Sequence, residues 1–278
     1  MRKFLSRIKY LVVKQFNILA LLLSGKYFSN KKKILGLKDL HKGKRCFIIC
    51  NGPSLRPEDL TKIHEAGDVS IGMNMIARIY DKTPWRADYL LATDGICFKE
   101  GNRDLVFNNK AKITFCNMSM FLKMPSLPGK KIFLNLKNSR TLLDKPKFSE
   151  KAEDYLYSIG TTTFEAIELA KYIGCSEVYI LGCDMSYAVN IDKQGRIYYS
   201  ESGKNHFYKK ENDIVSHVTP YPTWEMEAAY DFAEKYSRSN NFRIFNATRG
   251  GMLDCFERVD FDSLFSGFIN LCESVVDY

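Results

Sequence analysis

The chain has 278 residues, of which 45% are hydrophobic and 26% charged, as expected for one large globular domain or two small ones. Its net charge of +9 is unevenly spread: residues 1–45 hold 13 of the 41 Lys/Arg but only one acid, Asp39. The remaining residues are therefore slightly acidic, which excludes a broad basic surface for nucleic acid. We predict no nucleic-acid partner.

The eight cysteines show no metal-binding pattern. No pair has CxxC spacing, and no histidine lies at a zinc-like distance from a cysteine pair. Several lie in apolar runs, such as Cys46–Cys50. We therefore predict buried thiols in a reducing compartment, with no metal and no cofactor.

Residues 1–23 look like a signal peptide, but Lys14, Gln15 and Asn17 interrupt the apolar run and no small-residue cleavage site follows. The run is also shorter than the roughly 20 apolar residues of a membrane span. On a helix, seven apolar residues share one side: Phe4, Ile8, Leu11, Val12, Leu19, Leu22 and Leu23.

Two interpretations of this segment remain open. In one, the helix lies on an anionic membrane, aided by Lys31–Lys33. In the other, it packs on the domain or on a second subunit. We expect residues 1–45 to form a basic, membrane-proximal segment, residues 46–278 a single α/β domain, and the protein to be cytoplasmic, on the inner face of the membrane.

Short apolar runs beyond residue 45 predict buried strands. They are 46–50, 69–73, 89–92, 112–116, 131–136, 177–181 and 242–245. Amphipathic stretches between or after them predict helices at 57–66, 162–173, 223–237 and 261–275. This alternation predicts a Rossmann-like, mostly parallel sheet with helices on both faces.

In such sheets ligands bind at the carboxyl ends of the strands. Polar residues follow most of the predicted strands, namely Asn51–Leu55, Asn74, Thr93-Asp94, Asn117, Asp184–Tyr187 and Asn246–Gly251. The recurrence favours one polar site built from several loops. Asn and Asp also cap helices and make turns, and that remains the alternative at each position.

The most specific motif is Asn51-Gly52-Pro53-Ser54-Leu55. We interpret Gly52 as letting the backbone approach a ligand, Pro53 as fixing the turn, and Ser54 as offering a hydroxyl and an N–H near a helix start. The motif is neither a Walker loop nor a GxGxxG fingerprint. It predicts a phosphate-bearing nucleotide of another kind.

A second motif, Gly160–Thr163, precedes a predicted helix that leads into the strand before Asp184. Hydroxyls and N–H groups at a helix start suit a phosphate or carboxylate. A capping box between Thr162 and Glu165 is the alternative, and both can hold together.

Residues 187–223 show no clear strand or helix but are rich in aromatic residues and histidine. They include Tyr187, Tyr198, Tyr199, His206, Tyr208, His217 and Tyr221, and Trp224 follows directly. Long unstructured segments are typically lids or disordered, and the aromatic content favours a lid over the site.

With these motifs in view, the chain resembles a broad bacterial and archaeal group. The group includes CMP-sialic-acid-dependent sialyltransferases, flagellin motility accessory factors and 6-hydroxymethylpterin pyrophosphokinase-like proteins. The resemblance rests on Asn51–Leu55, on the stretch from Gly160 to Asp184, and on Asn246–Gly251 followed by Phe256–Asp260. The last stretch looks more like the motility and pterin-kinase-like relatives.

The resemblance implies site roles. The nucleotide and sugar donor would contact Asn51, Gly52, Pro53, Ser54, Asn74, Asp94, Thr162, Thr163 and Asp184. His217 would be the general base, with His206 in reserve. Ser186 stands near a position at which the sialyltransferases have a tyrosine that steadies the leaving phosphate. Tyr187 or Tyr199 would then take over that role here.

The predicted reaction is therefore inverting, metal-independent glycosyl transfer. The donor would be CMP-sialic acid or a related CMP-sugar, and the acceptor a surface glycan of the lipopolysaccharide or capsule type. Assembly into a homo-oligomer stays open. The only D-x-D, Asp260-Phe-Asp262, is interpreted as a helix cap. Two alternatives stay open: a pyrophosphokinase using ATP and Mg²⁺, and a non-catalytic nucleotide-binding module of a glycan-assembly complex.

Overall fold

The computed structural model describes residues 2–99, 101–124, 130–138, 147–200, 205–208 and 220–266. Its helices are α1 (Arg2–Leu23), α2 (Lys26–Leu35), α3 (Pro57–Glu65), α4 (Arg103–Phe107), α5 (Thr162–Tyr172) and α6 (Thr223–Arg238), with short 3-10 turns η1 (Asn74–Ile79), η2 (Gly95–Phe98), η3 (Met118–Lys123) and η6 (Asp262–Phe265). Its strands are β1 (Arg45–Ile49), β2 (Val69–Met73), β3 (Tyr89–Ala92), β4 (Ile113–Asn117), β5 (Lys131–Leu134), β6 (Leu136–Asn138), β7 (Leu156–Ser158), β8 (Glu177–Leu181), β9 (Val189–Ile191), β10 (Ile197–Tyr199), β11 (Arg243–Asn246) and β12 (Glu257–Arg258).

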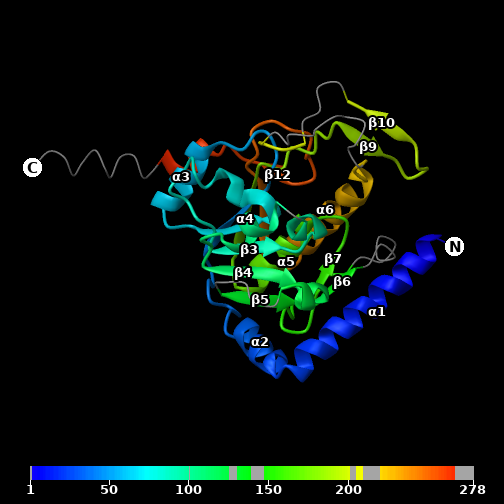
Figure 1. The fold of residues 1–278 in the computed structure, drawn as a ribbon. Helices are drawn as coiled ribbons and strands as arrows, with labels where there is room; N and C mark the ends of the chain where they lie inside the picture. The colour runs from blue at the N-terminus through cyan, green and yellow to red at the C-terminus, as the bar shows by residue number, and fades with distance from the viewer. Residues whose placement is uncertain are drawn as a thin grey trace, which may run out of the picture.

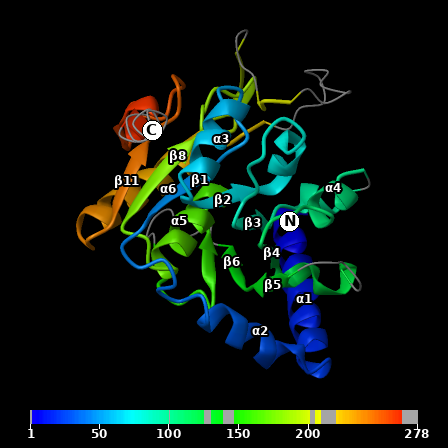
Figure 2. The same ribbon diagram turned by 90° about the vertical axis from the view of Figure 1, so that its left-hand side faces the viewer.

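The molecule is built around one eight-stranded sheet, ordered β12-β11-β8-β1-β2-β3-β4-β5 (Figures 1 and 2). Every neighbouring pair in it is parallel. The chain runs from β1 to β5 in one direction and then returns to add β8, β11 and β12 on the other side of β1. The predicted Rossmann-like α/β fold is therefore confirmed, and its switch point lies between β1 and β8.

The strand sequences explain why both faces of the sheet are covered. Successive side chains of a strand point to opposite faces. In β1, Cys46 and Ile48 join the core that contains α5 and α6, whereas Phe47 and Ile49 join the core that contains α3. All four are fully buried. An unbroken apolar run is thus what a central parallel strand requires.

Most predicted elements lie where the sequence placed them, but four details differ. The strand expected at 131–136 ends at Leu134, and Leu136–Asn138 instead pairs with β7 in a second, small sheet. The predicted lid contains a hairpin of β9 and β10. A short strand, β12, follows β11. Of the helix expected at 261–275, residues 262–265 form η6, and residues 267–275 lie outside the described residues.

The amino-terminal segment packs on the body through polar side chains. Lys14 donates to the Leu136 carbonyl at 2.7 Å, and Asn17 accepts from the Leu122 N–H at 2.8 Å. Asn30 bonds both the N–H and the carbonyl of Phe133 in β5. Residues 1–45 are therefore not a free appendage.

No single helix among the described residues is long and apolar enough to cross a bilayer, although the pair Ile8–Leu23 and Lys26–Leu35, bent by 95°, meets the length and composition test together.

Candidate functional site

A hollow of about 890 Å³ opens at the carboxyl edge of the sheet. Its walls come from the ends of β1, β2, β3, β4 and β8, the start of α5, and residues 205–208 and 220–226. Among the residues predicted for the site, it is lined by Asn51, Gly52, Pro53, Asn74, Asp94, Thr162, Thr163, Asp184 and Tyr187. The expected convergence of several strand-end loops on one pocket is thus observed.

The loop after β1 holds an acid of the loop after β8. The Ser54 hydroxyl donates to Asp184 Oδ2 at 2.9 Å, and the Ser54 N–H points at the same oxygen at 3.4 Å. Burial raises the pKa of Asp184, against the opposing effect of these hydrogen bonds. Ser54 is not among the residues that line the pocket, so its hydroxyl serves Asp184.

This contact also explains Gly52. A Cβ on Gly52 would lie 1.9 Å from Asp184 Oδ2 and 2.5 Å from the Gly182 carbonyl oxygen. The glycine is therefore required by close packing within the protein, whereas the sequence suggested close approach of a ligand. Asn51 keeps the ligand-facing part of the motif: its Oδ1 is buried and has no hydrogen-bond partner among the described residues.

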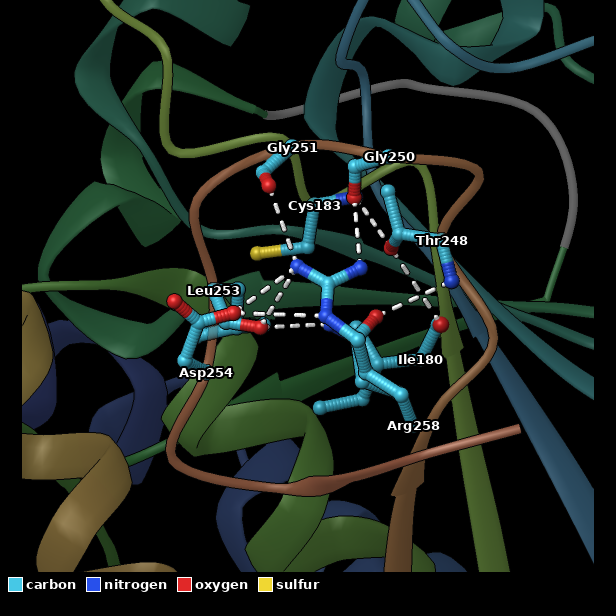
Figure 3. A network of polar contacts seen from close by, with 9 residues as sticks. Ile180, Cys183, Thr248, Gly250, Gly251, Leu253, Asp254 and Arg258 are labelled. Carbon is cyan, nitrogen blue, oxygen red and sulfur yellow. Dashed lines mark hydrogen bonds and ion pairs between the residues drawn. The ribbon is translucent and has the colours of Figure 1, made fainter.

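The loop after β11 braces the same turn from the other side (Figure 3). Thr248 Oγ1 accepts from the Cys183 N–H at 3.1 Å, and the Met252 N–H donates to the Asp184 carbonyl at 2.8 Å. Arg258 donates to the carbonyls of Gly250, Gly251 and Leu253. No residue of Asn246–Gly251 lines the pocket, so this motif supports the site from behind.

Asn74 links the ends of β2 and β3 to the start of α5. It has φ of 49°, an uncommon conformation for a residue other than glycine. Its amide donates to Thr162 Oγ1 at 3.3 Å, and its Oδ1 accepts from the Asp94 N–H at 3.4 Å. Asp94 in turn caps η2 by accepting from the Ile96 N–H. The polar residues after β2 and β3 and before α5 therefore form one connected network.

The start of α5 offers the pocket hydroxyls and N–H groups. Thr161 is the residue that caps the helix, accepting from the Thr163 N–H at 3.2 Å. The Thr162–Glu165 capping box suggested by the sequence is thus wrong by one position, and the Glu165 side chain is used elsewhere. The first turn of an α-helix attracts anions, because its N–H groups are free and the helix dipole is positive there. The prediction that this segment holds a phosphate therefore stays a prediction with a physical reason.

Glu165 is a pocket residue that the sequence reasoning assigned only to capping. It is 3% exposed, lines the pocket and accepts from the Thr93 hydroxyl at 2.6 Å. Burial raises its pKa to about 7, although the hydrogen bonds from Ser158 and Thr93 favour the charged form. The available signal in the sequence was a carboxylate among the apolar residues of this helix, a signal that Glu168 shares.

Part of the predicted lid closes over the pocket. The Phe207 N–H donates to the Asn51 carbonyl at 2.9 Å, and the His206 and Tyr208 rings stack 5.0 Å apart at the pocket wall. Tyr187 stacks on Tyr221 with ring centroids 4.1 Å apart, and both line the pocket.

One predicted catalytic residue does not line the pocket, and another cannot be placed. Tyr199 lies on β10, 69% exposed, and does not line the pocket, because its hairpin extends beyond the sheet edge. His217 lies outside the described residues.

Acidic and thiol groups elsewhere have structural partners. Asp260 accepts from the Ser263 N–H at 2.8 Å, and Asp262 pairs with Lys62 and Arg249, so the D-x-D is a turn and ion-pair element. No group of three or more His, Cys, Asp or Glu within the described residues is placed to hold a metal. The seven described cysteines are free and mostly buried, as predicted.

Comparison with known proteins adds a family. A family model described as 6-hydroxymethylpterin diphosphokinase MptE-like matches residues 25–190. No curated protein matches the chain.

Two solved structures match this chain at low sequence identity. The MAf glycosyltransferase from Magnetospirillum magneticum AMB-1 is 13% identical with a TM-score of 0.49, over 85% of this chain and 39% of that one. The UDP-glucose 4-epimerase of Thermotoga maritima, solved with UDP-glucose, is 8% identical with a TM-score of 0.28, over 73% of this chain and 54% of that one. The chain thus spans only part of each of these two proteins.

Proposed function

The chain belongs to the 6-hydroxymethylpterin diphosphokinase MptE-like family, and from this premise we propose that it is a glycosyltransferase using a nucleotide-activated sugar. The observation that carries the proposal is the convergence of amide, hydroxyl and carboxyl groups from five strand ends on one hollow of about 890 Å³. That volume lies within the range of pockets that enclose one organic ligand. The buried Asn51 Oδ1, without a partner among the described residues, is ready to accept from such a ligand.

The charge of the pocket favours sugar transfer over diphosphate transfer. Among the described residues that line it, Lys99 is the one lysine or arginine, beside the acids Asp94, Glu165, Asp184 and Glu225. In diphosphate transfer, the β- and γ-phosphates of ATP move to the acceptor as AMP leaves, and fixed cations or Mg²⁺ must neutralise their concentrated negative charge. In transfer from a CMP-sugar, the sugar moves to the acceptor and CMP leaves with a single phosphate, which the hydroxyls and N–H groups at the start of α5 can hold.

The proposed donor is CMP-sialic acid or a related CMP-sugar, transferred with inversion and without metal to a surface glycan. Thr162 and Thr163 hold the leaving phosphate, and the Tyr187 ring closes the wall beside it. A histidine of the lid takes the proton of the acceptor hydroxyl as that oxygen attacks the sugar. His217 is the candidate from the family resemblance, and His206 is the candidate that lines the pocket.

A second candidate has its own support. The family takes its name from a 6-hydroxymethylpterin diphosphokinase, an enzyme that transfers diphosphate from ATP. On that reading, Asp94 and Asp184 would hold Mg²⁺. The two functions differ in nucleotide and in metal dependence, so one experiment separates them.

The test is a thermal-shift series with CMP, CDP, UDP, GDP and ATP, each with and without Mg²⁺. A ligand at 100 times its Kd stabilises the folded state by about 2.7 kcal/mol, which is readily measured. We expect metal-independent stabilisation by CMP, reduced in Thr162→Ala and retained in Thr248→Ser behind the site. Stabilisation by Mg²⁺-ATP alone would overturn glycosyl transfer and establish the second candidate.

Activity measurements then identify the base. With CMP-sugar and acceptor, the His217→Ala and His206→Ala variants are compared for turnover and for CMP binding. Loss of turnover in one variant, with CMP binding kept, assigns the base. Full turnover in both would contradict a histidine base.

A further inference from the structure

The first helix exposes an apolar stripe directly opposite its contact with the body. Val12, Phe16, Leu19 and Leu23 are 62%, 64%, 49% and 81% exposed. Their spacing of four, three and four residues places them on one line along a helix. Ile8, 42% exposed, extends the line by one turn.

The opposite side of the helix explains how this arises. Lys14, Asn17 and Leu21 share that side and are buried against the body. Lys14 and Asn17 are polar, and both hydrogen-bond backbone groups of the body. Polar residues therefore face the protein and apolar residues face outwards, which is the reverse of an ordinary surface helix. Packing among the described residues does not account for the stripe.

The second helix continues the pattern on the same side of the molecule (Figure 1). Asn30 and Ile34 are buried, whereas Phe28 and Leu35 are 74% and 45% exposed. Lys32 is also exposed on this outer side of α2. The outward faces of α1 and α2 thus combine large apolar side chains with positive charge.

Further positive charge lies beside α2. A hollow of about 620 Å³ between α2, the end of η3 and β5 is lined by Lys26, Lys33, Lys130 and Lys131, together with Phe121 and Met124. Within residues 1–45, 13 Lys/Arg stand against one acid. A second copy of this chain would bring the same positive charge to the same surface, which is unfavourable. An anionic lipid surface supplies both the apolar phase and the negative charge.

We propose that α1 and α2 bind an anionic membrane surface, with Val12, Phe16, Leu19 and Leu23 in the acyl-chain boundary and the lysines of α2 at the headgroups. The helices lie in the interface plane. Tyr10 of α1 also lines the pocket, so this helix forms part of the pocket wall. A consequence, which rests on the proposed function, is that the acceptor is reached at a lipid surface.

The test is sedimentation of the full chain with vesicles of phosphatidylcholine alone or mixed with phosphatidylglycerol. We expect binding to the anionic vesicles. In the double variant Val12→Glu/Phe16→Glu the binding should fall about tenfold or more, because two apolar side chains that would enter the membrane are lost. The variant Lys26→Glu/Lys33→Glu should lose the preference for phosphatidylglycerol. Met252→Glu, a 70% exposed apolar residue of the body, is the matched control and should bind as the unaltered chain.

Two results would overturn the proposal. One is equal sedimentation of the Val12→Glu/Phe16→Glu variant and the unaltered chain. The other is a lipid-free dimer, measured by analytical ultracentrifugation, that this variant dissociates, since the stripe would then be a subunit interface. Nucleotide thermal shifts on the same variants separate membrane binding from nucleotide binding. If the shifts are retained while vesicle binding is lost, the substitutions act on membrane binding and leave the nucleotide site intact.

Discussion

At the scale of single residues, many polar groups in and around the pocket form hydrogen bonds with one another, and only some are left to bind a ligand. Ser54 and Gly52 are committed to Asp184, and Asn74 is committed to Thr162 and the Asp94 backbone. Such mutual bonding fixes the groups before a ligand arrives, which lowers the entropic cost of binding.

Glu165 should make the stability of the protein depend on pH. Burial raises its pKa from the ordinary 4.5 to about 7. The folded state therefore binds a proton that the unfolded state has lost, so the stabilising contribution is full below about pH 4.5 and disappears as the pH rises through 7. We expect the Glu165→Gln variant to lack this decline and to gain up to about 3 kcal/mol relative to the unaltered chain between these pH values.

Urea denaturation at several pH values measures this difference. The control is Glu58→Gln, which changes an exposed acid at the start of α3. Parallel pH profiles for the unaltered chain and Glu165→Gln would show that the Glu165 pKa is not raised.

At the scale of elements, Asn30 joins α2 to the outer edge of β5. Its side-chain amide donates to the Phe133 carbonyl at 2.8 Å, and its Oδ1 accepts from the Phe133 N–H at 2.7 Å. One side chain thus stands in for a neighbouring strand and satisfies an edge that is otherwise open to pairing.

We expect the Asn30→Ala variant to lose about 2 kcal/mol of unfolding free energy, because two backbone groups lose their partners. Chemical denaturation measures the loss. Ser29→Ala, at the adjacent exposed position of the same helix, should change stability by less than about 0.5 kcal/mol. An equal loss in both variants would mean that helix propensity, and not the contact with β5, is responsible.

At the scale of the whole molecule, an ion pair ties the last part of the described chain to α3, near its beginning. Arg249 pairs with Asp59 of α3, whose side chain is 3% exposed, at 3.0 Å and with Asp262 at 2.8 Å. Replacing one partner leaves a buried charge without its counter-ion.

Arg249→Leu should therefore lower the free energy of unfolding by about 3 kcal/mol. Arg243→Leu provides the matched control, since Arg243 and Glu257 form an ion pair of similar length with both side chains about 60% exposed, and it should cost less than about 1 kcal/mol. Equal denaturation midpoints for the two variants would contradict a structural role of the buried pair.

The sequence alone was enough to predict the sheet and the place of the site. Unbroken apolar runs such as Cys46–Cys50 have no other stable location than a strand covered on both faces, and parallel strands bring their polar ends to one edge. Asn51, Asn74, Thr162 and Asp184 were therefore found in advance, and they line one pocket.

Only the tertiary structure decided which of these residues line the pocket and which hold its loops in place. Three features show this: Gly52 packs against an acid and not a ligand, Glu165 enters the pocket and does not cap a helix, and the apolar stripe of α1 faces away from the body. Each depends on contacts between segments more than 70 residues apart. Local periodicity fixes the relative directions of side chains on one element. It contains no information about which neighbour those side chains meet, because that is set by packing across the sheet.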